Sequence, residues 1–143
     1  MKKMIYNYKN RGLNSILDTG FYQGYEYVIL NLHTHPCAYI CLTKDNPFYQ
    51  KHYDDIPLLV HGGLTFSDNH LCRIEEYSEK YKCVVNTTFR RDWIIGWDYA
   101  HLGDCYDSIL GDDGKKYTTE EILNDVMFAI EQLRGLIDND IYS

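Results

Sequence analysis

Residues 25–32 have the sequence YEYVILNL, and residues 37–43 have the sequence CAYICLT. Both runs consist largely of β-branched, aromatic and other apolar residues, a composition that favours extended strands. The segment between them, HTHP at 33–36, is too short for much beyond a tight turn. Pro36 also biases His35 away from helical backbone. We therefore predict that the two runs form an antiparallel hairpin.

Further runs downstream predict additional strands. They comprise residues 58–66 (LLVHGGLTF), 70–77, 82–88 and 93–99. Turns are expected at residues 67–69 and 78–80, and residues 44–57 are expected to form a long loop. Gly62 and Gly63 fall inside the first of these runs, where glycines mark a bulge or the close approach of another backbone.

The C-terminal part of the chain has the pattern of an amphipathic helix over residues 118–138. Thr118 and Glu121 match a capping box, in which each side chain binds the backbone N–H of the other. Apolar residues then recur at helical spacing, at Ile122, Val126, Ile130, Leu133 and Ile137. Residues 1–22 are expected to form an N-terminal arm, with room for one helical turn at residues 14–18. The sequence thus predicts a single α+β domain over residues 1–143: a mostly antiparallel sheet of about five to six strands packed against one long C-terminal helix.

The composition restricts the partners and the compartment. The formal charge of −7 argues against extended DNA or RNA, since proteins that bind polyphosphate backbones are normally basic. The five cysteines are odd in number and contain no CxxC, which argues against a disulfide framework or a zinc ribbon. The N-terminus lacks the apolar core of a signal peptide, and no apolar run approaches the ~20 residues of a membrane helix. We expect a cytoplasmic protein with reduced thiols that does not bind a membrane.

Polar residues and glycines gather in the HGG segment and at the end of the last predicted strand, and a sheet can bring these two places together. Gly62 and Gly63 would offer backbone N–H groups to an anion. Arg90 or Arg91 would pair with a phosphate group, because guanidinium matches its geometry. Trp97 or Phe66 would stack on a base, and His61 and His101 would orient it. The predicted ligand-binding set is therefore His61, Gly62, Gly63, Phe66, Arg90, Arg91, Trp97, Asp98 and His101.

Three other interpretations remain open. A metal-dependent hydrolase would use His61, Asp98, His101 and Asp104, since imidazole with carboxylate suits zinc or a non-haem metal that activates water. A Cys–His nucleophile would use Cys37 or Cys105. An acidic, tyrosine-rich surface could instead bind a host protein. The same residues also allow a purely structural role, in which Asp98 and Asp104 hold a turn.

Several segments resemble a family of small proteins encoded by phages and prophages. They are PCAY (36–39), YDDI (53–56), HGGLTF (61–66) and GWDYAHLGD (96–104), and the resemblance covers roughly residues 22–138. This chain has Ala38 where the family usually has glycine and Tyr99 where it usually has cysteine, which weakens the idea of a cysteine nucleophile there. Small phage proteins of this size often counter host defence. Some of them, such as the Thoeris anti-defence sponges, sequester a nucleotide signal without cleaving it.

From the residues and this resemblance together we predict a phage-encoded accessory protein of the bacterial cytoplasm. It would bind a small, anionic, nucleotide-like signal without cleaving it, as a non-enzymatic protein without a cofactor. Because a small sheet leaves strand edges open for pairing between copies, a homo-oligomer is expected.

Overall fold

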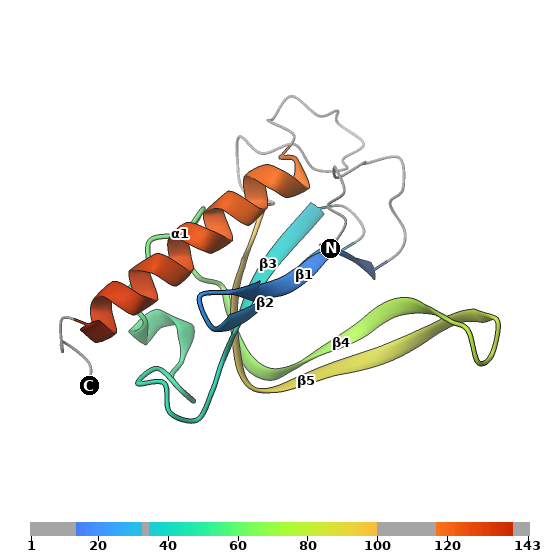
Figure 1. The fold of residues 1–143 in the computed structure, drawn as a ribbon, viewed down its shortest axis with the longest axis horizontal. Helices are drawn as coiled ribbons and strands as arrows, with labels where there is room; N and C mark the ends of the chain where they lie inside the picture. The colour runs from blue at the N-terminus through green and yellow to red at the C-terminus, as the bar shows by residue number, and fades with distance from the viewer. Residues whose placement is uncertain (1–13, 33–34, 100–116, 139–143) are drawn as a thin grey trace.

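The computed structural model describes residues 14–32, 35–99 and 117–138, and within these ranges it has five strands and one α-helix. The strands are β1 (Asn14–Tyr22), β2 (Tyr25–Leu32), β3 (His35–Leu42), β4 (Phe66–Ser78) and β5 (Cys83–Asp98); a single 3₁₀ turn, η2 (Tyr53–Asp55), lies in the loop after β3, and the helix is α1 (Thr119–Asp138). All pairings are antiparallel, in the order β1-β2-β3-β5-β4. The predicted α+β class is confirmed, and Figure 1 shows α1 lying across the sheet.

The sheet is curled. Its order places β1 and β4 at opposite edges, yet the two strands also contact each other. Strand β5 pairs with β3 through residues 93–98 and with β4 along most of its length. Its first half pairs with β4 alone, and Figure 1 shows this part of the β4–β5 hairpin extending away from the helix.

The two faces of the sheet carry two apolar cores, because successive side chains of a strand point to opposite faces. Ile29, Ile40 and Trp97 belong to the core under the helix. Val28, Tyr39 and Ile94 belong to the second core, which Leu71 and Ile74 of β4 help to close. The second core explains the curl, since bending the hairpin across this face removes its apolar side chains from water.

Helix α1 begins with the predicted capping box. The Glu121 backbone N–H donates to Thr118 Oγ1 at 3.0 Å, and the Thr118 N–H donates to Glu121 Oε1 at 3.1 Å. The apolar stripe then packs under the sheet, through Ile122, Leu123, Val126, Ala129, Ile130 and Leu133. Within the described residues, no helix is both long enough and apolar enough to cross a membrane.

The prediction of a helical turn at residues 14–18 is wrong, because these residues belong to β1. Their backbone pairs with β2, with a register shift between Ile16 and Asp18. The shift places Leu17 and Asp18 next to each other in buried positions. Pairing with a neighbouring strand outweighs weak local helix preference.

The predicted strand at residues 58–66 is also wrong, except for Phe66, where β4 begins. Gly62 and Gly63 have φ angles of 69° and 85°, in the left-handed region that an extended strand does not use. The Gly63 N–H donates to Val60 O at 2.9 Å and closes a turn at His61 and Gly62.

The structure joins predicted segments that the sequence analysis separated. The expected turn at residues 67–69 lies within β4, where the register shifts between Asp68 and His70. The runs at residues 82–88 and 93–99 form one long strand, β5. The expected turn after Ser78 is confirmed, with the Lys82 N–H donating to Ser78 O at 2.7 Å.

Gly96 and Gly135 form a matched pair for testing this packing. A Cβ atom at Gly96 would lie 2.3 Å from Tyr39 Cδ1 and 2.7 Å from Ala38 O, whereas one at Gly135 would meet nothing within 4 Å. We expect Gly96→Ala to lower the free energy of unfolding by about 1–3 kcal/mol through overpacking. Gly135→Ala in the helix should raise it by about 0.5–1 kcal/mol. Urea unfolding of the two variants measures both, and equal effects of the two substitutions would contradict the packing described.

Candidate functional site

The described members of the predicted ligand-binding set are distributed over three cavities. His61 lies in one, Phe66, Trp97 and Asp98 line a second, and Arg90 and Arg91 line a third. Gly62 and Gly63 form the turn beside His61, and His101 lies outside the described residues. The described residues of the predicted set therefore do not form one common cavity.

The first, which we call the helix-side cavity, has a volume of about 360 Å³. It is lined by Leu59, Val60, His61, Tyr117, Asp125 and Phe128. Ligand sites typically measure about 300–1,000 Å³, so this one is large enough for one compact group.

The rings of His61, Tyr99 and Tyr117 form one cluster beside the helix-side cavity. The imidazole stacks on the Tyr99 ring, with centroids 4.6 Å apart and planes 12° apart. Tyr117 packs edge-on against His61 at 5.0 Å and against Tyr99 at 4.9 Å. Tyr99 and Tyr117 are 18 positions apart in the sequence, so these contacts bring together residues from two separate parts of the chain. They also confirm that the HGG turn lies beside the end of β5, as predicted.

A chain of hydrogen bonds runs from the sheet through this ring cluster to the helix. The buried Trp97 indole N–H donates to Tyr99 Oη at 3.1 Å, and the Tyr99 O–H donates to Asp125 Oδ2 at 2.6 Å. Burial first, and the bond to Asp125 second, raise the pKa of Tyr99 far above its ordinary value. Tyr99 therefore remains a protonated donor that fixes the direction of the Asp125 carboxylate.

The helix also holds the other wall of the helix-side cavity. The Leu59 N–H donates to Gln132 Oε1 at 2.8 Å, and Gln132 Nε2 donates to Leu59 O at 2.7 Å. This pair of bonds fixes the extended backbone that leads into the His61 turn. The Leu59 and Phe128 side chains are 77% and 58% exposed and form an apolar rim.

The second, which we call the inner cavity, opens on the opposite face of the sheet and has a volume of about 230 Å³. Its lining includes Cys37, Tyr39, Phe66 and Asp98. Tyr39 and Phe66 form an edge-on ring pair at 5.4 Å, so Phe66 packs within the protein. Burial raises the pKa of Cys37 to about 12, so its sulfur is a thiol at neutral pH and a poor nucleophile.

Trp97 is likewise a packing residue. Its side chain is 1% exposed and belongs to the core under the helix. Its indole N–H is engaged with Tyr99. The ring therefore packs within the core and offers no open face to a ligand.

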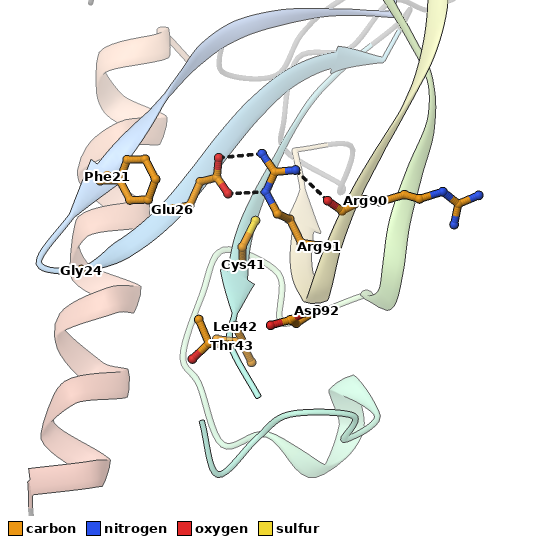
Figure 2. A pocket seen from close by; sticks show the side chains of 9 residues that line it. All are labelled: Phe21, Gly24, Glu26, Cys41, Leu42, Thr43, Arg90, Arg91 and Asp92. Atoms are coloured by element: carbon orange, nitrogen blue, oxygen red, sulfur yellow. Dashed lines mark hydrogen bonds and ion pairs between the residues drawn. The ribbon is translucent and has the colours of Figure 1, made fainter. Parts of the chain in front are cut away.

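The third, which we call the arginine cavity, lies between the β1–β2 turn and β5 and has a volume of about 430 Å³. Figure 2 shows Arg91 pointing across it to Glu26, while the Arg90 side chain points away. The Arg91 guanidinium makes two hydrogen bonds to the Glu26 carboxylate, one of them 2.9 Å long from Nη2 to Oε2. Arg91 also lies over the Phe89 ring, 3.9 Å from its centroid. The charge that was expected to pair with phosphate is thus already balanced by Glu26.

The metal-site interpretation receives no support from the described residues. His61 lines the helix-side cavity, whereas Asp98 lines the inner cavity on the other face of the sheet. Among the side chains that the structure describes, no three of the His, Cys, Asp or Glu type lie close enough together to hold a metal ion. His101, Asp104 and Cys105 lie outside the described residues.

Sequence reasoning missed Tyr99, Tyr117 and Asp125 as site residues. Asp125 lies in α1 between the buried residues Leu123 and Val126. A polar residue on the apolar side of a helix usually has a hydrogen-bond partner inside the protein, and this is the signal that could have identified it. No local pattern marks Tyr99 as a site residue. No local pattern marks Tyr117, because its contacts come from residues distant in sequence.

The chain matches no protein-family model. A search of curated proteins and a search of solved structures also found no significant match.

The Arg91–Glu26 pair makes a testable contribution to acid stability. The pKa of Glu26 is lowered below its ordinary value, chiefly by the hydrogen bonds from Arg91, while burial opposes this. A carboxylate with a lowered folded-state pKa stabilises the fold above its unfolded pKa of about 4.3, and this contribution is lost as pH falls through the folded-state value.

We therefore expect Glu26→Gln to lower the melting temperature at pH 7 by on the order of 2–4 °C. The gap to the wild type should close as the pH is lowered from about 5 to 3. Thermal unfolding at a series of pH values measures this. Asp45→Asn, which removes an exposed carboxylate in the loop after β3, is the control. A gap that stays constant down to pH 3 would contradict the role assigned to Arg91.

Proposed function

We propose that the protein is a non-enzymatic binder of a small nucleotide-type molecule, which it holds by the base in the helix-side cavity. The observation that carries the proposal is the combination of stacked rings and one fixed carboxylate in a cavity of about 360 Å³. Flat aromatic faces stack on any base, and a few placed polar groups provide orientation.

The charges that line the helix-side cavity favour entry of the base of a nucleotide over entry of its phosphate groups. Asp125 is the acidic side chain among the described lining residues, and no Lys or Arg is among them. Since a carboxylate repels phosphate, we expect the sugar and phosphates to face solvent. This differs from the sequence-based hypothesis, in which Arg90 or Arg91 held the anionic end.

Binding without cleavage is part of the proposal. The Tyr99 hydroxyl, behind His61, already accepts from Trp97 and donates to Asp125. The described lining contains no thiol, amine or aliphatic hydroxyl to attack a ligand. Capture would remove the molecule from solution unchanged, as a sponge does. A phage origin and a role against host defence rest on the sequence resemblance alone and stay predictions.

The proposal is tested with a panel of nucleosides, cyclic nucleotides and ADP-ribose-type nucleotides. A ligand at about 100 times its Kd should stabilise the fold by about 2.7 kcal/mol, raising the melting temperature by on the order of 5–10 °C. Mass spectrometry of the ligand recovered after heat denaturation should show an unchanged mass.

Two variants locate the site. His61→Ala, which removes the ring stacked on Tyr99, should weaken binding at least about tenfold. Arg90→Ala, which removes an exposed side chain that points away from the arginine cavity, should leave affinity unchanged. If no member of the panel shifts the melting temperature, or if Arg90→Ala abolishes binding while His61→Ala does not, the assignment to the helix-side cavity is wrong.

A further inference from the structure

The helix-side cavity contains one polar group whose hydrogen-bonding character is fixed. Asp125 accepts the Tyr99 O–H through Oδ2, and Tyr99 is itself held by the buried Trp97 N–H. Rotating the carboxylate would break the bond to Tyr99 and leave buried groups unpaired. Asp125 thus presents its other oxygen, Oδ1, in one orientation.

Among the residues that the structure describes, Asp125 Oδ1 has no hydrogen-bond partner. An ionised carboxylate only accepts hydrogen bonds. The other polar groups of the lining adapt to a ligand, because an imidazole nitrogen or a phenol can donate or accept. Selectivity at this site therefore comes from Asp125, and it requires a donor on the ligand.

We infer that the helix-side cavity selects bases that carry an exocyclic amino group over their oxo counterparts, with the amino group donating to Asp125 Oδ1. The inference rests on the proposed function and specifies its ligand class. Adenine and cytosine carry such a group on an aromatic edge. Hypoxanthine and uracil place a carbonyl oxygen there, and two acceptors facing each other repel.

The expected difference in affinity between the amino and oxo bases follows from the loss of a charge-assisted hydrogen bond to Asp125, which is partly exposed to water. A site built around a hydrogen bond rejects the analogue that lacks it far more strongly than it rejects a change in shape. Asp125 is only partly buried, so the discrimination is moderated by water. We expect a ratio of at least about tenfold in Kd between the amino and oxo forms.

The experiment is calorimetric titration with adenosine and inosine, and in parallel with cytidine and uridine. The members of each pair differ by replacement of the amino group with a carbonyl at one ring position. The wild type should bind the amino form of at least one pair at least about tenfold more tightly. Asp125→Asn offers an amide that can donate as well as accept, so it should reduce the ratio to near one or invert it.

Asp92→Asn is the matched control, because Asp92 is an exposed carboxylate that lines the arginine cavity. It should keep the wild-type ratio. The melting temperature of Asp125→Asn, whose amide oxygen can still accept from Tyr99, checks that the fold is retained. If that variant does not fold, Asp125→Glu in its place should still lower the ratio, since the longer side chain displaces the acceptor.

The titrations distinguish failure of the amino selectivity from failure of the proposed base binding. Equal affinity for the amino and oxo forms, or a preference that persists in Asp125→Asn, overturns the amino selectivity and leaves base binding in place. Failure of all four nucleosides and of the nucleotide panel to bind overturns the proposed function, and the selectivity with it.

Discussion

The phenol of Tyr99 joins parts of the molecule that are distant in sequence. Its hydroxyl accepts a hydrogen bond from Trp97 of β5 and donates one to Asp125 of α1, and its ring carries His61 of the HGG turn. Its backbone N–H donates to Pro36 O of β3. The Tyr99 and Trp97 side chains are both buried, so without the phenol the Trp97 indole N–H would lose its partner with no access to water. Sheet, turn and helix therefore all make contact with this one residue, which lies behind His61 at the helix-side cavity.

The curled sheet separates the chemistry of its two faces. Side chains alternate at the end of β5 and at Tyr99, which follows it, so Trp97 and Tyr99 lie toward the helix while Asp98 lies toward the second core. Glu26 and Arg91, from β2 and β5, neutralise each other in a third place. Residues that are adjacent in sequence, such as Arg90 and Arg91, thus point in different directions, and residues from distant segments share a site. This separation is the reason that we propose entry of a base, and not of a phosphate group, into the helix-side cavity.

Much of the fold follows from the sequence, because local rules agree with the tertiary structure there. The β2–β3 hairpin and the capped helix are both set by short-range patterns, and both are observed. The errors occur where long-range contacts determine the backbone. Residues 14–18 are extended because β2 offers a partner, and residues 58–65 are not, because two glycines with positive φ form a turn. The site was predicted in part: the neighbourhood of His61 and the end of β5 was expected, but Tyr117 and Asp125 join it only through packing of the helix.

A double-mutant cycle between Tyr99→Phe and Asp125→Ala measures the central interaction directly. The free energies of unfolding of the wild type, the two single variants and the double variant give the coupling between the hydroxyl and the carboxylate. A hydrogen bond between a buried phenol and a carboxylate predicts a coupling of about 1–3 kcal/mol, with each single change destabilising the fold. Additive effects within about 0.5 kcal/mol would mean that the two side chains do not depend on each other, and would contradict the central role of Tyr99 in holding the helix-side cavity together.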